Sequence, residues 1–215
     1  MVGTVINIIL TTMVAYPLSR KNFQGRKYYT ILFMITMFFS GGMIPSYILM
    51  NQLHLNGTCW AIILTGTISV YNMIVMRTFF VNSVPGELLE AAKIDGITDI
   101  GYLFKVLIPL SKAVFGVVTL YYAVAHWNSY FTAMLYLRDR DMYPLQLVLR
   151  DVLRASQSIE LSGIEDDPEL VAQARDAANT IKYGLIVVST VPIMAVFPFV
   201  QRFFEKGVMI GSVKG

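Results

Sequence analysis

The stretch with the most informative residue pattern is residues 82–108, NSVPGELLEAAKIDGITDIGYLFKVLI, which Pro109 follows directly. Ser83 and Pro85 signal the start of a helix, and Gly96 signals its end because glycine readily adopts the left-handed conformation of a helix cap. A second short helix is predicted to start near Thr98 or Asp99 and to end at Pro109. The pattern therefore predicts a helix–turn–helix, and its chemistry would be protein docking.

The two predicted helices carry apolar residues at helical spacing. In the first helix the apolar patch is formed by Leu88, Leu89, Ala91 and Ala92. In the second helix the shared face is formed by Ile100, Leu103, Phe104 and Leu107. Glu90 and Lys93 lie three residues apart and can pair on the first helix. A short helix of this kind suits a groove on another protein, although the spacing equally allows a helix that packs on its own bundle.

The sequence offers little for catalysis or metal binding. Its two histidines, His54 and His126, lie far apart, and Cys59 is its single cysteine. One cysteine excludes an internal disulfide framework and a multi-cysteine metal site. The chain contains neither a G-x-x-x-x-G-K-[ST] phosphate-binding loop nor an H-E-x-x-H metal motif. We therefore expect no catalytic residue, no metal and no cofactor in this chain.

The amino-acid composition indicates that the chain is a membrane protein. Of the 215 residues, 55% are apolar and only 14% are charged, whereas soluble domains carry about 25% charged residues. A net charge of +3 is too small to indicate a nucleic-acid partner. Five stretches approach the roughly 20 apolar residues that a helical span needs: 2–18, 28–50, 59–81, 113–137 and 181–204. We expect an all-α integral membrane protein with a single transmembrane domain over residues 1–215.

The basic residues of the short connections set the orientation, because Lys and Arg are enriched on the cytoplasmic side. The first connection contains Arg20, Lys21, Arg26 and Lys27 and no acid. Residues 83–108 and the C-terminal tail are also predicted to be cytoplasmic. Residues 138–180 hold nine acids and five bases and are predicted to form an extracytoplasmic loop. This topology puts the N-terminus outside, so we expect the sequence to begin within a longer protein, after one earlier span.

Residues 143–153 predict a further helix inside the extracytoplasmic loop. Leu145, Leu149, Val152 and Leu153 recur at helical spacing after Pro144. Such spacing is typical of an amphipathic helix lying on or near the outer surface.

Polar and aromatic residues within the spans are candidates for a substrate path, because such residues usually face the interior of a helix bundle. They are Tyr71 and Asn72 in the third span, and His126, Trp127, Asn128 and Tyr130 in the fourth. Packing or hydrogen bonding between helices is the alternative role for each of them.

The spacing EAA at 90–92, Gly96 and VLIP at 106–109 resembles the EAA loop of ATP-binding-cassette (ABC) importer permeases. The family pattern is EAA, three residues, G, nine residues and I-x-L-P, so this chain departs from it at Val106 and Ile108. The likeness extends to three other segments: AHWN at 125–128, YPL at 143–145 and GVMIGSVKG at 207–215. Together these segments resemble the second permease subunits of oligosaccharide importers of the maltose type.

This resemblance implies a type I importer fold with six spans, of which five are present here. It implies a bacterial plasma-membrane transport subunit that carries a carbohydrate inward by alternating access. The implied coupling residues, which would contact the ATPase or aim the helix, are Glu90, Ala91, Ala92, Asp95, Gly96 and Pro109. Implied partners are two ATPase subunits that bind ATP and Mg, a homologous second permease, an extracytoplasmic solute-binding protein and the lipid bilayer. The C-terminal segment 207–215 either reaches toward the ATPase or is a flexible end.

The main alternative is a secondary transporter or channel without ATP coupling. Ion coupling needs paired acids or a ladder of charges within the membrane. The five expected spans contain no Asp or Glu, which argues against this alternative.

Overall fold

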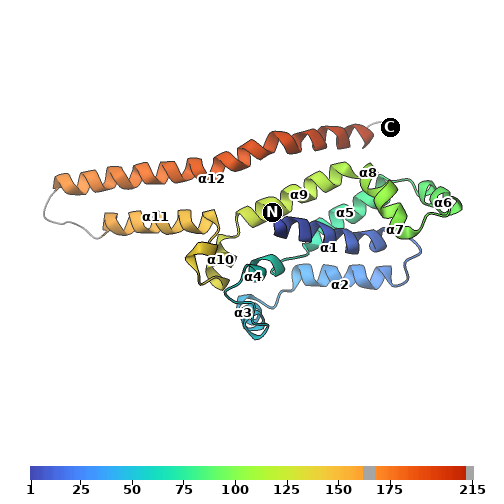
Figure 1. Cartoon of the computed structure of the whole chain (residues 1–215), viewed down its shortest axis with the longest axis horizontal. Coiled ribbons are helices and arrows are strands. Elements are labelled where there is room, and N and C mark those ends of the chain that lie inside the picture. The colour runs from blue at the N-terminus through green and yellow to red at the C-terminus, as the bar shows by residue number, and fades with distance from the viewer. Residues whose placement is uncertain (162–167, 212–215) are drawn as a thin grey trace. The chain divides into compact units, whose positions relative to one another are not determined.

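The computed structural model describes residues 1–161 and 168–211, without the side chains of 156–172, 174–175, 199–200 and 202–211. Every regular element in the described ranges is a helix, as predicted (Figure 1). In chain order these are α1 Val2–Ser19, α2 Arg26–Phe38, α3 Met43–Gln52, α4 Cys59–Leu64, α5 Val70–Asn82, α6 Glu87–Ile94, α7 Asp99–Tyr102, the π-helix η1 Leu103–Leu107, α8 Ile108–Leu110, α9 Lys112–Trp127, α10 Tyr130–Tyr136, the 3₁₀-helix η2 Arg140–Met142, α11 Leu145–Leu161 and α12 Pro168–Gly211.

The chain forms two compact units. Unit 1 contains residues 1–49, 63–126 and 199–215, and unit 2 contains residues 50–62 and 127–198. The predicted single domain over residues 1–215 stays a prediction.

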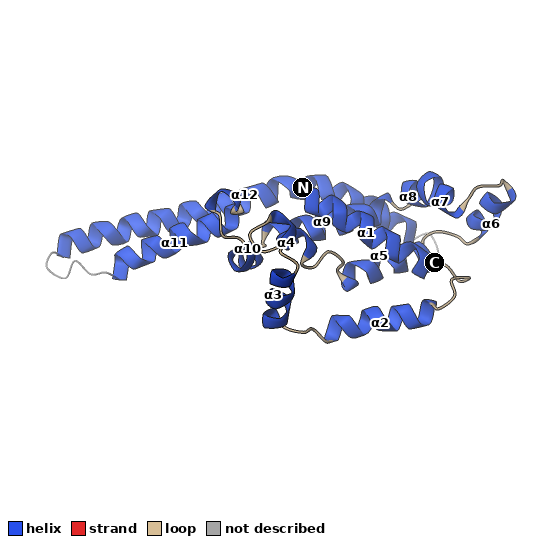
Figure 2. Ribbon diagram, turned by 60° about the horizontal axis from the view of Figure 1, so that its bottom comes forward, coloured by secondary structure: helices blue, strands red, loops and turns tan. Residues whose placement is uncertain are grey.

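Continuous helices cover only some of the expected spans. Among the described residues, α1 and the segment Asp176–Pro198 of α12 are long and apolar enough to cross a membrane, and two bent helix pairs bring the number to four at most. The second expected span is such a pair, since α2 and α3 meet at 111° (Figure 2). Gly42 has φ +87° just before α3, a backbone conformation that suits glycine.

The expectation of one helix in each of the third and fourth spans is wrong. The third is divided into α4 and α5, with Gly66 at φ +79° between them. The fourth is divided into α9 and α10, which are separated by residues 128–129. In contrast, α12 continues through Pro192 and Pro198. It begins at Pro168, within the expected extracytoplasmic loop, so the described residues of 138–180 are largely helical.

The α1 helix has its polar side inside unit 1. Its buried face is made of small and polar residues: Gly3, Thr4, Asn7, Thr11, Thr12 and Ala15, with Leu18 at the end. Its opposite face exposes Val2, Val5, Ile9 and Met13 by half or more. This arrangement is the one expected where lipid, which is as apolar as leucine, surrounds a bundle whose interior is held by close packing and hydrogen bonds.

The core of unit 1 lies where α1, α5 and α9 meet. Met73, Met76 and Phe80 of α5 pack with Val114 and Val118 of α9, and all five are less than 5% exposed. This core also takes in residues of the loop 83–108, which fixes the loop to the bundle.

Unit 2 confirms the predicted amphipathic helix as α11. Its Leu147 is 2% exposed and packs against Ala133 of α10 and Leu137, with Ile62 and Tyr143 alongside. The acidic residues 165–167 lie outside the described residues.

Candidate functional site: the loop between α5 and α9

The first helix of the loop, α6, ends in a well-formed cap. The backbone N–H of Ile97 donates to the carbonyl of Ala92 at 2.8 Å, and that of Gly96 donates to Lys93 at 3.1 Å. These two bonds form a Schellman motif, in which the residue after the C-cap adopts a left-handed backbone conformation. Gly96 supplies it with φ +71°, and a Cβ there would meet no atom within 4 Å. Gly96 is therefore required by backbone conformation and not by lack of space.

The α6 helix has two different apolar faces where the sequence predicted one patch. Ala92 is 5% exposed and packs with the half-buried Leu89 against the core of unit 1. Leu88, Ala91 and Ile94 point to the other side and are exposed, Ile94 by 87%. One face therefore packs on the helix's own bundle, and the other face is free of contacts within the described residues, so docking of that face stays a prediction. Ile94 was missed because it ends the helix next to the charged Lys93 and Asp95.

Acidic side chains border the free face. Glu87 and Glu90 lie in the first turn of α6, where the helix dipole favours negative charge. Glu90, Ala91 and Asp95 are all exposed. The predicted pair between Glu90 and Lys93 is absent, so the Glu90 carboxylate has no partner in the described part of the chain. The free face offers small and apolar contacts with negative charges at its edge.

The second half of the loop differs from its prediction in which residues are buried. Thr98 caps α7 as expected, with its hydroxyl accepting from the N–H of Gly101 at 3.1 Å. Tyr102 and Leu107 are the buried residues, whereas Ile100 is 70% and Phe104 64% exposed. The predicted shared face of Ile100, Leu103, Phe104 and Leu107 is divided between buried and exposed positions, because the π-helix η1 changes the helical period that the prediction assumed.

Pro109 lies inside a helix and does not end the unit. It occupies the first turn of α8, where a missing N–H is tolerated. The helical path runs on to Leu110 and then turns at Ser111 into α9, with an 84° bend between the two segments.

The C-terminal end of α1 holds the loop in place. The Tyr16 hydroxyl donates to the carbonyl of Asp99 at 2.8 Å. The guanidinium of Arg20 lies 4.4 Å from the ring centre of Tyr16 and 4.8 Å from that of Tyr102. Such stacking attracts a cation to an aromatic face. Tyr16 and Arg20 were missed as partners of the loop because about 80 residues separate them from Asp99 and Tyr102 in sequence. Their contacts place the first basic connection and the loop 83–108 at the same end of unit 1.

A hydrogen-bonded cluster joins the three main helices of unit 1. The Tyr122 hydroxyl lies 2.6 Å from Thr11 Oγ1 and accepts from the backbone N–H of Ser69 at 3.0 Å. The Thr12 hydroxyl donates to the carbonyl of Ile8 at 2.7 Å. A polar stripe at positions 4, 7, 11 and 12 is the signal that could have revealed this cluster.

Three substrate-path candidates lie in unit 1. Asn72 is 5% exposed, and Tyr71 is half exposed with its ring 6.1 Å from that of Tyr121. His126 packs so closely on Gly3 that a Cβ there would lie 2.7 Å from the imidazole. Asn72 and His126 are therefore packing residues in this structure.

The other three candidates lie in unit 2. Trp127 has a buried Nε1 without a hydrogen-bond partner among the described residues, and Asn128 is exposed. Tyr130 lies under the guanidinium of Arg150, 5.5 Å from the ring centre. Among the side chains that the structure describes, no group of three His, Cys, Asp or Glu is placed to hold a metal ion.

The chain is similar to proteins of one known family over nearly its whole length. Residues 5–210 match the family described as "Binding-protein-dependent transport system inner membrane component". The chain belongs to this family. It is therefore a multi-pass inner-membrane importer permease with the type I importer fold, as the EAA-like spacing indicated. Family membership decides against a secondary transporter or channel.

Individual relatives in this family cover the chain from end to end. It is 41% identical to the polygalacturonan/rhamnogalacturonan transport system permease protein YtcP of Bacillus subtilis, over all of this chain and 73% of that protein. It is 42% identical to protein LplC of the same organism, over all of this chain and 70% of that protein. A solved bacterial ABC transporter involved in the import of the acidic polysaccharide alginate aligns with a TM-score of 0.76 and 31% identity, over 94% of this chain and 71% of that one.

Proposed function

We propose that this chain is the permease subunit of a carbohydrate importer and that separate ATPase chains drive it through α6. The relatives whose names state a substrate carry polymers or oligomers of sugars, which supports an oligosaccharide as the cargo. The chain has no phosphate-binding loop of its own, so ATP and Mg are bound by the partner subunits.

The observation that carries this proposal is the division of α6 into an anchored face and a free face. Leu89 and Ala92 fix the helix to the core, so a force applied to the helix is passed to α5 and α9. Leu88, Ala91 and Ile94 are free to enter a groove on a partner. Gly96 holds the helix end in one direction through its cap.

The six coupling residues take different roles in this proposal. Glu90, Ala91 and Asp95 are exposed and contact the ATPase. Ala92, Gly96 and Pro109 position the helix and its following turns. The assembly contains two ATPase subunits, a homologous second permease and an extracytoplasmic solute-binding protein, so that closure of the ATPases moves two permeases together.

Exposure separates the substrate-path candidates. Tyr71, Asn128 and Tyr130 keep exposed side chains and are free to contact a passing sugar by stacking and hydrogen bonding. Asn72, His126 and Trp127 hold neighbouring elements in place.

A pair of neighbouring alanines tests the proposal. Ala91→Phe adds a bulky ring to the free face of α6 and should lower sugar-stimulated ATPase activity and uptake by about tenfold or more in proteoliposomes. The permease itself should keep its melting temperature, because Ala91 is exposed. Ala92→Phe overfills the core at a cost of about 1–3 kcal/mol and should lower the melting temperature.

Uptake should be measured with both a neutral and an acidic oligosaccharide, together with co-purification of the ATPase. Full uptake and ATPase binding by the Ala91→Phe variant would contradict the proposal.

A further inference from the structure

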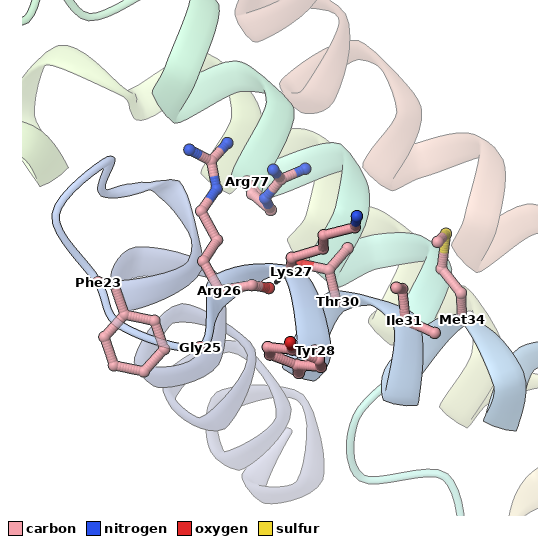
Figure 3. A pocket seen from close by; sticks show the side chains of 9 residues that line it. All are labelled: Phe23, Gly25, Arg26, Lys27, Tyr28, Thr30, Ile31, Met34 and Arg77. Atoms are coloured by element: carbon pink, nitrogen blue, oxygen red, sulfur yellow. Dashed lines mark hydrogen bonds between the residues drawn. The ribbon is translucent and has the colours of Figure 1, made fainter.

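A groove lies between the start of α2 and α5, and none of its lining residues has a role in the proposed coupling mechanism. Its volume is about 650 Å³, within the range of small-molecule sites. Figure 3 shows its lining residues: Phe23, Gly25, Arg26, Lys27, Tyr28, Thr30, Ile31, Met34 and Arg77. All of them belong to unit 1.

Three cations and no acid line the groove. Arg26, Lys27 and Arg77 extend toward the same side of α2 in Figure 3. Arg77 Nε donates to the carbonyl of Leu18 at 2.9 Å, which holds this guanidinium at the end of α1. Within the described residues neither Arg26 nor Lys27 has an ion-pair partner. Three like charges held together without a counter-charge repel one another and favour a bound anion.

The rest of the groove is apolar and continues along α2. Ile31 and Met34 follow the cations at helical spacing and are 40% and 38% exposed. No residue of α2 is buried, so this face of the helix is uncovered within the described part of the chain. An anionic group at one end and an apolar run at the other match an amphipathic ligand.

The groove lies at the end of unit 1 that the basic residues of the first connection predict to be cytoplasmic. Leu18, which Arg77 contacts, is at the same end of α1 as Tyr16 and Arg20, and these two residues hold the loop 83–108. Anionic lipids give the cytoplasmic leaflet its negative charge and attract Lys and Arg near a helix end.

We propose that this groove binds an anionic phospholipid of the cytoplasmic leaflet. The lipid phosphate lies among Arg26, Lys27 and Arg77, and an acyl chain follows Ile31 and Met34 along α2. A bound lipid would neutralise the repulsion between the cations and join the start of α2 to α5, next to the element that the ATPase moves.

Native mass spectrometry of the whole transporter, released from nanodiscs of equal parts phosphatidylcholine and phosphatidylglycerol, tests this site. The wild type should retain phosphatidylglycerol in preference to phosphatidylcholine. In Arg26→Gln/Lys27→Gln the ratio should fall by about 25-fold, since each cation near the surface contributes roughly fivefold, or about 1 kcal/mol. Arg26 and Lys27 donate no side-chain bond within the described chain, so their replacement should leave the fold intact.

Lys21→Gln/Lys112→Gln is the matched control, since it removes two exposed cations outside the groove, and its ratio should not change. Equal retention by the groove variant and the wild type would overturn the proposal. If phosphatidylglycerol and phosphatidylcholine are retained equally, the site is only an apolar groove and the proposal is overturned. Displacement of the lipid by inorganic phosphate at millimolar concentration would overturn it as well, as would cross-linking of Lys27 to a partner subunit. Because lipid retention requires no transport, it stands or fails separately from the carbohydrate proposal.

Discussion

The loop between α5 and α9 and the polar cluster inside the bundle are built in opposite ways. The cap of α6 joins residues within five positions of one another, from Ala92 to Ile97. The cluster joins Thr11 to Tyr122 across 111 positions. The loop therefore carries its structure in consecutive residues, whereas the cluster exists only after the helices have assembled. Changes on the free face and in the cap of α6 should therefore reduce uptake strongly, whereas changes in the cluster should reduce stability with little change in uptake.

The largest effect on uptake is expected from one of two identical glycine-to-alanine substitutions in the loop. Gly96 has φ +71° and Gly86 has φ −63°, and neither Cβ would meet a neighbour within 4 Å. Gly96→Ala forces a left-handed alanine, which costs about 1–2 kcal/mol, and should lower uptake by about tenfold as α6 loses its direction. Gly86→Ala should leave uptake unchanged.

Uptake assays and the melting temperatures of both variants provide the measurement. Should both variants transport equally, the cap does not direct the helix. Gly96→Asn should lie between the two, because asparagine tolerates the left-handed region better than alanine.

A smaller effect is expected where the loop joins α1. Arg20→Met removes the cation from between Tyr16 and Tyr102, each contact contributing roughly 0.5–1 kcal/mol. Amide hydrogen exchange in α7 should become about fivefold faster, with uptake reduced severalfold. Lys21→Met is the neighbouring control and should change neither value. Unchanged exchange in the Arg20 variant would show that α1 does not hold the loop.

The smallest effect is expected in the cluster. Tyr122→Phe leaves the backbone N–H of Ser69 without its acceptor, and hydrogen bonds between membrane helices contribute about 0.6 kcal/mol on average. The free energy of unfolding in detergent should fall by about 1 kcal/mol with little change in uptake per folded molecule. A double-mutant cycle with Thr11→Val isolates the side-chain pair, and additive effects would show that the pair is uncoupled.

The same contrast explains what could be predicted from the sequence. Gly96, Thr98 and a short amphipathic helix within 143–153 were predicted because capping and amphipathic patterns are local. The two faces of α6 were not separated, because residues 89 and 92 are drawn inward by a core that forms from α1, α5 and α9. Arg20 and Tyr102 gave no signal, since nothing in either segment specifies the other. The breaks in the third and fourth spans were missed because hydropathy averages over glycine and short turns.

Docking of the free face of α6 on an ATPase subunit can be measured directly. The direct measurement places a photoactivatable maleimide on Ile94→Cys in a Cys59→Ser background, within the whole transporter. Leu145→Cys in α11 is the control, since Leu145 is also exposed, by 41% against 87% for Ile94. Docking of α6 predicts a cross-link from position 94 to the ATPase and none from position 145. Equal labelling from both positions, or none from position 94, would contradict it.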